Sequence, residues 1–308
     1  MTAPGPEVRV TGQLAYEEIT AVLALAADAA RADGANPLSE HVVLHVRHGG
    51  GHSRHLLIEE PEGRALLAYA HLDLGEPAEG PAAELAVSPS ARRRGLGGLL
   101  LDEVVRQTDG YPAGLRLWAH GANTSANELA AAHGFRRVRR LWQLRRALTD
   151  PPDPVELPQG FTVRPFDAGR DVEGWLGLNA TAFADLPDQG GWSRQDLQRR
   201  MAEPWFDPAG FLMAHDAEGR LVGFHWTKVH RHPDQHHEPL GEVYVLGVDP
   251  LVRGRGLGRA LTLAGLHHLR GLGLSEVLLF VDADNAGAIA LYRGLGFAAW
   301  DSDTLFRR

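Results

Sequence analysis

The chain carries two copies of one arginine- and glycine-rich segment, and a constant 161 residues separate them. The residues shared at this offset are Val87/Val248, Pro89/Pro250, Arg92/Arg253, Arg94/Arg255, Gly95/Gly256 and Gly97/Gly258. A second set of matches follows at an offset of 162: Asn123/Asn285, Ala126/Ala288, Leu129/Leu291, Gly134/Gly296 and Phe135/Phe297. One residue of slippage in a loop accounts for the change of offset. Self-similarity over this range predicts two copies of one domain.

The second copy is typical of a strand, a turn and a loop that opens a helix. The apolar run 243–248 suits a buried strand, Pro250 has no N–H for a strand ladder, and apolar residues from Leu257 onward follow helical spacing. Gly256 and Gly258 permit backbone conformations that a side chain would block. Backbone N–H groups at such a helix start, flanked by arginines, predict a phosphate- or pyrophosphate-binding site.

Two common phosphate-binding motifs are excluded by the residues present. A Walker A loop ends in Gly-Lys-Ser/Thr, whereas Gly258 is followed by Arg259 and Ala260. A Rossmann fingerprint has the spacing G-x-G-x-x-G directly after the first strand of a parallel unit. The glycines of this loop are spaced G-x-G-x-G and lie late in the chain.

The 308 residues are enough for two domains, and a proline-rich segment separates the two halves. The prolines that predict a stiff, extended linker are Pro151, Pro152, Pro154 and Pro158. We therefore expect an N-terminal domain at 1–148, a linker at 149–158 and a C-terminal domain at 159–308. Strand and helix patterns follow the same order in both halves, so each half is predicted to be α/β, with helices packed on a mixed sheet.

Charge and composition exclude several classes of protein. The net charge of −8 does not favour a nucleic-acid or anionic-membrane partner, and no apolar run is long enough to span a bilayer. The polar N-terminus lacks the order of a signal peptide, so a cytoplasmic location is expected. The absence of cysteine excludes disulfides, thiolate metal sites and a cysteine nucleophile.

Two local clusters have simple interpretations. Arginines recur along one predicted strand, at Arg136, Arg137, Arg139, Arg140, Arg145 and Arg146. This pattern favours a solvated or edge strand over a nucleic-acid surface. Histidines gather at His230, His232, His236 and His237. Imidazoles can ligate metals, but the polar segment 231–235 favours a connecting loop, and we predict no metal.

The pattern Arg253-x-x-Gly256-x-Gly258 resembles the pyrophosphate loop of the GNAT acetyltransferase superfamily, whose members bind acetyl-CoA. The resemblance implies that the strand before each loop splays from its neighbour and hydrogen-bonds the pantetheine arm. In the second half it assigns acetyl-CoA contacts to Leu246, Gly247, Val248, Arg253, Gly254, Arg255, Gly256, Leu257, Gly258, Arg259 and Asn285. In the first half it assigns them to Leu85, Ala86, Val87, Arg93, Arg94, Gly95, Leu96, Gly97 and Gly98.

The same resemblance implies that catalysis belongs to the second half. It makes Glu242 the general base and Tyr292 the general acid that protonates the departing thiolate. At the repeat offsets the first half has Pro81 and Ala130 instead, neither of which transfers a proton. We therefore expect the first half to bind acetyl-CoA without turning it over. The simpler alternatives are a core aromatic for Tyr292 and a solvated strand residue for Glu242.

Nearly the whole chain is similar to tandem members of this superfamily that acetylate the cysteinyl amine of Cys-GlcN-Ins (desacetylmycothiol). The segments that carry this resemblance include 182–190, 242–248 and 281–285. It implies substrate contacts from Glu40, Asp185, Lys228, Glu242 and Asp282, because carboxylates suit an ammonium group and sugar hydroxyls.

Two other functions share most of these features. One is an acetyltransferase for a different amine, such as an aminoglycoside or a protein N-terminus. The other is a non-enzymatic acyl-CoA sensor, which both loops would permit but which has no need of Glu242 and Tyr292. For every enzyme alternative the expected partners are acetyl-CoA and an amine, with no metal, and the expected state is a monomer.

Overall fold

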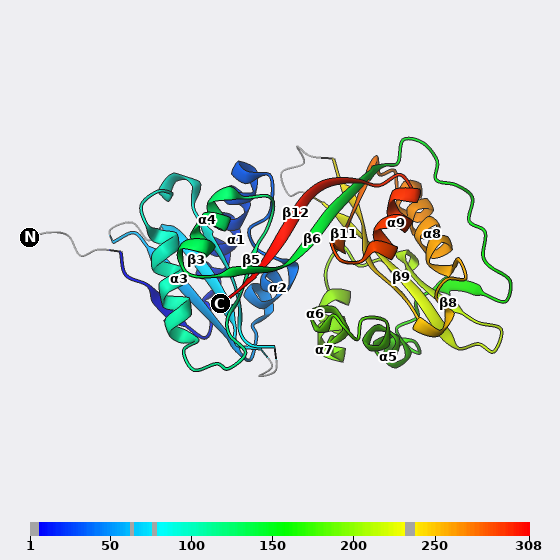
Figure 1. Ribbon diagram of the computed structural model, residues 1–308, viewed down its shortest axis with the longest axis horizontal. Coiled ribbons are helices and arrows are strands. Elements are labelled where there is room, and N and C mark those ends of the chain that lie inside the picture. Colours follow the sequence, from blue (N-terminus) through cyan, green and yellow to red (C-terminus); the bar gives the residue numbers. More distant parts are fainter. Residues whose placement is uncertain (1–5, 62–64, 76–78, 232–237) are drawn as a thin grey trace, which may run out of the picture. The chain divides into compact units, whose positions relative to one another are not determined.

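Figure 1 shows the computed structural model, which describes residues 6–61, 65–75, 79–231 and 238–308. The chain divides into two compact units. Unit 1 comprises Met1–Trp142 together with Asp301–Arg308, and unit 2 comprises Gln143–Trp300. Both units are α/β with a mixed sheet, so the predicted fold class is confirmed.

Unit 1 is built on a sheet of order β1-β2-β3-β4-β5-β12. Its elements are β1 (Arg9–Thr11), α1 (Tyr16–Asp33), α2 (Glu40–His48), β2 (Ser53–Glu59), β3 (Leu66–Asp73), β4 (Ala82–Val87), η1 (Pro89–Ala91), α3 (Leu96–Gln107), β5 (Arg116–Ala119), α4 (Thr124–Ala132) and the first part of β6 (Arg136–Ala147). β4 and β5 are parallel, and the other neighbours with a defined register are antiparallel.

Unit 2 repeats this plan, with the strand order β6-β11-β10-β9-β8-β7. Its elements are β7 (Thr162–Pro165), α5 (Val172–Ala182), α6 (Pro187–Gly190), α7 (Arg194–Met201), η2 (Pro208–Gly210), β8 (Phe211–His215), β9 (Leu221–His230), β10 (Leu240–Val248), η3 (Pro250–Val252), α8 (Leu257–Gly271), β11 (Glu276–Asp282), α9 (Ala286–Gly294) and β12 (Ala298–Arg307). β10 and β11 are the parallel pair.

The division of the chain differs from the boundaries expected from sequence, because the two long last strands cross between the halves. The end of β12 pairs antiparallel with β5, from Thr304↔Ala119 to Arg307↔Arg116, and so belongs to unit 1. The end of β6 belongs to unit 2, where the Leu148 N–H donates to the Ser275 carbonyl at 2.7 Å. A linear cut at the proline-rich segment cannot capture this exchange of strands.

The sheet of unit 1 separates two cores by simple alternation along its strands. Leu56 and Ile58 pack with α3 residues in one core, whereas Leu57 between them packs with α1 and α2. Tyr69 likewise faces the α1–α2 side, between Ala68 and Ala70 on the other. This period of two lets one sheet bury both of its faces.

In unit 2 the sheet face that packs with α5 and α7 is aromatic. Trp226 stacks on Phe211 with ring centroids 4.3 Å apart, and Trp175 meets Trp226 edge to face at 5.9 Å. These side chains are almost completely buried. Leu257 and other apolar residues of α8 form a second core. Among the described residues, no helix is long and apolar enough to cross a membrane.

The exchange of strands predicts that a residue near the C-terminus stabilises the N-terminal unit. Phe306 is 4% exposed and lies in the core that contains Leu56 and Leu100. Phe306→Ala should lower the free energy of unfolding of unit 1 by about 3–5 kcal/mol through loss of buried area and a residual cavity. Hydrogen exchange should show protection falling in β4 and β5 and unchanged in β8 and β9. Tyr16→Ala, at an 80% exposed site, is the control and should change stability little. Equal loss of protection in both units would contradict the strand assignment.

Candidate active site and cofactor loops

In unit 2 the central parallel strands separate where the acetyl-CoA site is expected. β10 pairs with β11 only from Gly241↔Val277 to Val243↔Leu279. On its other side β10 stays paired with β9 as far as Val248↔Gly223. The backbone of Leu246–Val248 therefore faces β11 without the regular ladder between them, and those of its N–H and C=O groups that do not pair with β9 are directed at the gap.

A β-bulge precedes this gap, because the β10–β9 register shifts between Val243 and Val245. The corresponding β4–β3 register in unit 1 is regular from Ala82 to Val87. The bulge adds one residue to β10, bends the strand and re-aims its side chains. Strand register consequently makes Ala82 the counterpart of Glu242, instead of the Pro81 that a fixed offset of 161 indicates.

The arginine–glycine loop has the backbone that its sequence requires. Gly254 and Gly256 have φ of 77° and 84°, in the left-handed region that glycine tolerates. Gly256 is the residue that caps the start of α8, so the first N–H groups of that helix point toward the loop. This geometry suits an anion, and the loop lies at the end of the splayed strand.

The loop arginines all have partners within unit 2. Arg253 donates to the Val248 carbonyl at 3.4 Å and to the Ala182 carbonyl at 2.9 Å, and so ties the loop to β10 and α5. Arg255 lies 4.6 Å from the Phe161 ring centroid. Arg259 pairs with Asp153 at 2.7 Å. Arg253 therefore braces the loop, and all three arginines remain exposed.

The loop of unit 1 keeps the same backbone with a different residue. Gly95 has φ of 81° and begins α3, as Gly256 begins α8. Arg93, at the position of Gly254, has φ of 62° and is the one non-glycine residue with positive φ in the described chain. Such a backbone costs of order 1 kcal/mol for an ordinary side chain. Because the left-handed turn survives that cost, the shape of the loop is retained in unit 1.

Glu242 is a buried carboxylate at the paired end of β10. Its side chain is 6% exposed, and its Oε2 lies 2.6 Å from Nε2 of His230. Lys228 is its direct cross-strand neighbour on β9. Burial alone raises the pKa of Glu242, but the hydrogen bond and charge of His230 and the charge of Lys228 outweigh it, so the pKa lies below its ordinary value. Glu242 is therefore ionised at neutral pH.

Tyr292 lies on α9, which follows β11. Its side chain is 7% exposed and packs edge to face on Phe297, with centroids 5.7 Å apart. Burial raises the pKa of Tyr292 to about 12, so its hydroxyl keeps its proton at neutral pH. The counterpart Ala130 is fully buried in the core of unit 1. Unit 2 thus contains an ionised Glu242 carboxylate and a protonated Tyr292 hydroxyl, and the corresponding residues of unit 1 are Ala82 and Ala130.

An aromatic wall lies beside Glu242. The Lys228 ammonium lies 4.7 Å from the Trp205 ring centroid and 5.0 Å from that of Tyr244. Arg200 donates to the Tyr244 hydroxyl at 2.8 Å and covers the Trp192 ring at 3.7 Å. A cation is attracted to the face of an aromatic ring, so these contacts hold the Lys228 and Arg200 side chains in place.

The remaining predicted substrate residues occupy different settings. Asp282 ends β11, and its Oδ1 accepts from the Asp284 N–H at 3.0 Å. Asp185 is exposed between α5 and α6. Asn285, predicted to bind the cofactor, caps α9 by accepting from the Ala288 N–H at 3.0 Å. Glu40 is the first residue of α2 in unit 1 and is half-buried.

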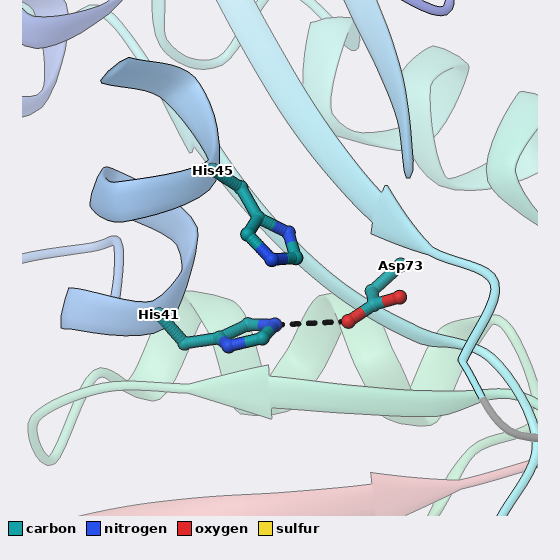
Figure 2. Close-up of side chains that lie close together, drawn as sticks. All are labelled: His41, His45 and Asp73. Atoms are coloured by element: carbon teal, nitrogen blue, oxygen red, sulfur yellow. Dashed lines mark hydrogen bonds and ion pairs between the residues drawn. The ribbon is translucent and has the colours of Figure 1, made fainter. Parts of the chain in front are cut away.

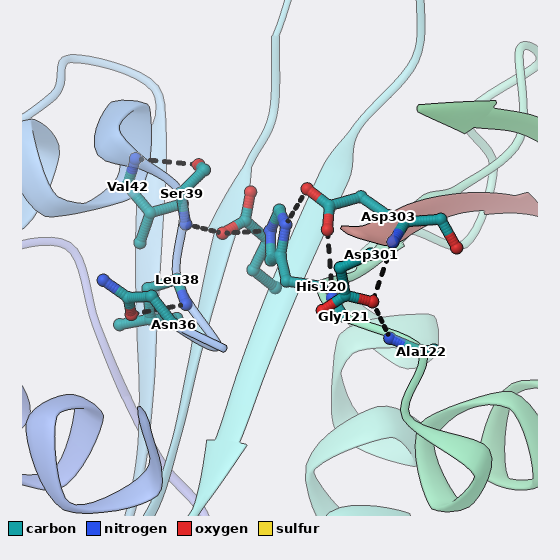
Figure 3. A network of polar contacts seen from close by, with 11 residues as sticks. Asn36, Leu38, Ser39, Val42, His120, Gly121, Ala122, Asp301 and Asp303 are labelled. Atoms are coloured by element: carbon teal, nitrogen blue, oxygen red, sulfur yellow. Dashed lines mark hydrogen bonds and ion pairs between the residues drawn. The ribbon is translucent and has the colours of Figure 1, made fainter. Parts of the chain in front are cut away.

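Unit 1 has its own buried charged network, part of which is shown in Figure 3. Glu84 of β4 is 6% exposed and accepts from the Ser39 N–H at 2.6 Å. His120, which follows β5, lies 3.3 Å from Glu84 and 2.9 Å from Asp303 of β12. Burial lowers the pKa of His120, but Glu84 and Asp303 outweigh it and raise it to about 10. Ser39 caps α2, so this network holds the helix end that carries Glu40.

Sequence reasoning missed three functional features. His230 was grouped with a histidine cluster and not with Glu242, although its position two residues beyond Lys228 puts both on one face of β9. The aromatic wall consists of Trp192, Trp205 and Tyr244. Tyr244 is far from the two tryptophans in the sequence, and the three residues come together only when α7 and β10 pack against each other. The charged network needs residues from both ends of the sequence. His232, His236 and His237 lie outside the described residues.

Comparisons with known proteins agree with the geometry. The sequence profile of the acetyltransferase (GNAT) family matches residues 20–135 and 178–297. A tandem GNAT protein of the clavulanic acid biosynthesis pathway has the same fold, with a TM-score of 0.76, 21% identity and 98% coverage of both chains. A GCN5-related N-acetyltransferase from Sphaerobacter thermophilus is 26% identical, with a TM-score of 0.70, over 98% of this chain and 95% of that one.

The chain belongs to the GNAT family of acetyltransferases, with one family domain in each half. Its full-length relatives are more specific. A mycothiol acetyltransferase of Acidothermus cellulolyticus is 49% identical over 100% of this chain and 97% of its own. One of Thermobispora bispora is 54% identical over 94% and 95%.

The depressed pKa of Glu242 predicts how pH limits the reaction. The carboxylate is ionised above its ordinary pKa and is lost as a base only as pH falls through the lower, folded value. His230→Ala removes the hydrogen bond and a positive charge, so the acid limb of kcat/KM should move to higher pH. A pH profile of acetyl transfer measures this shift. His267→Ala, which removes a histidine bonded to the Asp153 carbonyl, is the control. If the acid limb of His230→Ala lies at the same pH as that of the wild type, His230 does not set the pKa of the base.

Proposed function

We propose that unit 2 transfers the acetyl group of acetyl-CoA to the cysteinyl α-amine of Cys-GlcN-Ins, giving mycothiol and CoA. The carrying observation is the ionised Glu242 and the protonated Tyr292 in the unit whose strands splay next to the anion-binding loop. The choice of acceptor is supported by full-length relatives named mycothiol acetyltransferase.

The pyrophosphate of acetyl-CoA would bind the N–H groups of the loop 253–259, and the pantetheine arm would extend β10 along Leu246–Val248. Both ligand parts meet backbone groups, whose positions are fixed by the strand and by the start of α8. Arg255 and Arg259 would supply positive charge at the rim. Arg253 would act indirectly, by bracing the loop against β10.

The reaction proceeds by direct attack. Glu242 takes a proton from the ammonium of the acceptor, directly or through one water, and the amine nitrogen forms a bond to the thioester carbonyl carbon. Backbone N–H groups near Leu246 stabilise the oxyanion. The carbon–sulfur bond then breaks, and Tyr292 donates its proton to the CoA thiolate. The attacking nitrogen gives up its second proton to solvent, and a proton from solvent restores the Tyr292 hydroxyl. An α-amine has an unperturbed pKa of about 8, so part of it is already deprotonated at neutral pH and it needs only a modest push. No covalent intermediate is needed, which suits a chain without cysteine.

The acceptor would be held by acidic and basic side chains around this centre. Lys228 and Glu242 form one side, and Asp282 and Asp185 supply carboxylates for the ammonium and the sugar hydroxyls. Glu40 would contribute a further carboxylate from the start of α2. The Ser39 cap and its bond to Glu84 fix that helix end.

Unit 1 would bind a second acetyl-CoA without turnover. Its strands β4 and β5 pair only at Ala82↔Arg116 and Ala83↔Leu117, so they splay as β10 and β11 do. Its loop keeps the left-handed turn at Arg93 and Gly95. A binding surface of this kind persists without the acid and base that turnover needs.

Removing the acid should slow chemistry without weakening cofactor binding. Tyr292→Phe should lower kcat by about 10²- to 10⁴-fold and leave the Kd for acetyl-CoA close to that of the wild type. Tyr16→Phe is the exposed control. Steady-state assays should compare Cys-GlcN-Ins with an aminoglycoside and an N-terminal peptide. Equal kcat/KM for all acceptors would refute the proposed substrate, and an unaffected Tyr292→Phe enzyme would favour the acyl-CoA sensor.

The two loops should be separable by matched substitutions. Native mass spectrometry of the wild type should show two CoA equivalents. Gly95→Val should remove one and preserve turnover, whereas Gly256→Val should remove the other and abolish turnover, because valine is disfavoured at positive φ. A wild-type protein that never carries more than one CoA would rule out the site in unit 1.

A further inference from the structure

The two units carry different side chains at the end of the sheet where unit 2 has Glu242. In unit 2 Lys228 lies opposite Glu242, and in unit 1 the equivalent pair in strand register is Asp73 opposite Ala82. Helix α2 covers Asp73 with two imidazoles, His41 and His45, as Figure 2 shows. Loss of the base and acid has therefore been accompanied by a new group of side chains at the same place.

These three side chains are arranged as metal ligands. His41 and His45 are one helical turn apart, so they project from the same face of α2, and their ring centroids are 4.1 Å apart. Nε2 of His41 lies 2.9 Å from Oδ2 of Asp73. One ligand atom from each of the three residues lies within 4.8 Å of the others. Tetrahedral bonds of about 2.1 Å place ligand atoms roughly 3.4 Å apart, so small side-chain rotations would complete the site.

The carboxylate is already oriented and charged for this role. Oδ1 of Asp73 accepts from the Gly75 N–H at 2.9 Å, which turns Oδ2 toward His41. The Asp73 carboxylate supplies the anionic oxygen ligand of the set. A ligating carboxylate fixed by a second hydrogen bond is typical of protein metal sites.

More imidazoles surround the three ligands. His71 of β3 is 1% exposed, its ring centroid lies 5.3 Å from that of His45, and its Nε2 has no hydrogen-bond partner in the described chain. Neutral imidazole is the form that binds a metal. Buried polar atoms in proteins usually have a hydrogen-bond partner, so His71 adds a buried ring nitrogen that lacks one beside the three ligands.

We propose that unit 1 binds one divalent transition-metal ion of the zinc class through His41, His45 and Asp73. Two nitrogen ligands and one oxygen favour such ions over Mg²⁺ and Ca²⁺, which prefer all-oxygen sites. The His41 side chain is 49% exposed, so the ion can enter from solvent and keep an exchangeable fourth ligand. The ion would join α2 to β3 next to Glu40. The binding of this ion does not rest on the proposed function.

The test uses the full-length, untagged protein after treatment with a chelator. Titration with Zn²⁺, by calorimetry and by competition with a chromophoric chelator, should give one site of micromolar or tighter affinity. His41→Ala and the isosteric Asp73→Asn should each weaken Zn²⁺ binding. His41→Ala should weaken it by more than about 100-fold, because loss of a residue that only supports a metal ligand already costs up to about that much. His133→Ala is the matched control, because His133 pairs with Asp102 at 3.3 Å on the surface of the same unit.

Two further readouts separate this site from others. Co²⁺ should give the visible absorption of a tetrahedral site in the wild type and in His133→Ala, but not in His41→Ala. Zn²⁺ should raise the thermal unfolding temperature of the wild type and not that of Asp73→Asn. Absence of one-equivalent binding would overturn the proposal. Binding that survives both ligand substitutions would also overturn it, and would direct attention to the histidines of 230–237. Neither result depends on acetyl transfer, which is assayed separately.

Discussion

The pairing of β12 with β5 is the interaction on which unit 1 depends. It closes the sheet after β5 and brings Asp303 onto His120, which in turn faces Glu84. Because the pKa of His120 is raised to about 10, the imidazolium stays charged between two carboxylates at neutral pH. Removing one member of such a group leaves the buried charges of the others without an opposite charge. This costs more free energy of folding than the interaction itself contributes. The N-terminal unit is therefore incomplete until the last residues of the chain are in place.

The same sheet plan places a buried carboxylate in different settings in the two units because of small local differences. A one-residue bulge in β10 and the neighbours Lys228 and His230 give Glu242 a buried position in which it stays ionised. β4 has no bulge, and its buried carboxylate, Glu84, lies two positions further along the strand and is used for a structural network. Splay and loop, by contrast, depend on strand pairing and backbone conformation, and both units retain them.

Much of this could be predicted from the sequence, because the strongest signals are local and repeated. The Gly256 and Gly95 turns, the helix starts and the α/β class follow from residues close together in the chain. The fixed offset failed at Glu242, where it indicates Pro81 and strand register gives Ala82, because a bulge leaves no mark in a pattern of matching residues. The exchange of β6 and β12 and the pairing of His230 with Glu242 were equally hidden, since both depend on which strands become neighbours.

Unit 1 has kept ionisable side chains in its interior. Its buried residues Glu84, His120 and Asp303 are ionisable, which an inert scaffold would replace with apolar side chains at no loss of stability. Glu84 instead accepts from the Ser39 N–H, Ser39 caps α2, and α2 begins at Glu40. A chain of hydrogen bonds thus runs from the C-terminal strand to a proposed substrate contact. The position of that contact depends on charges that only the completed fold brings together.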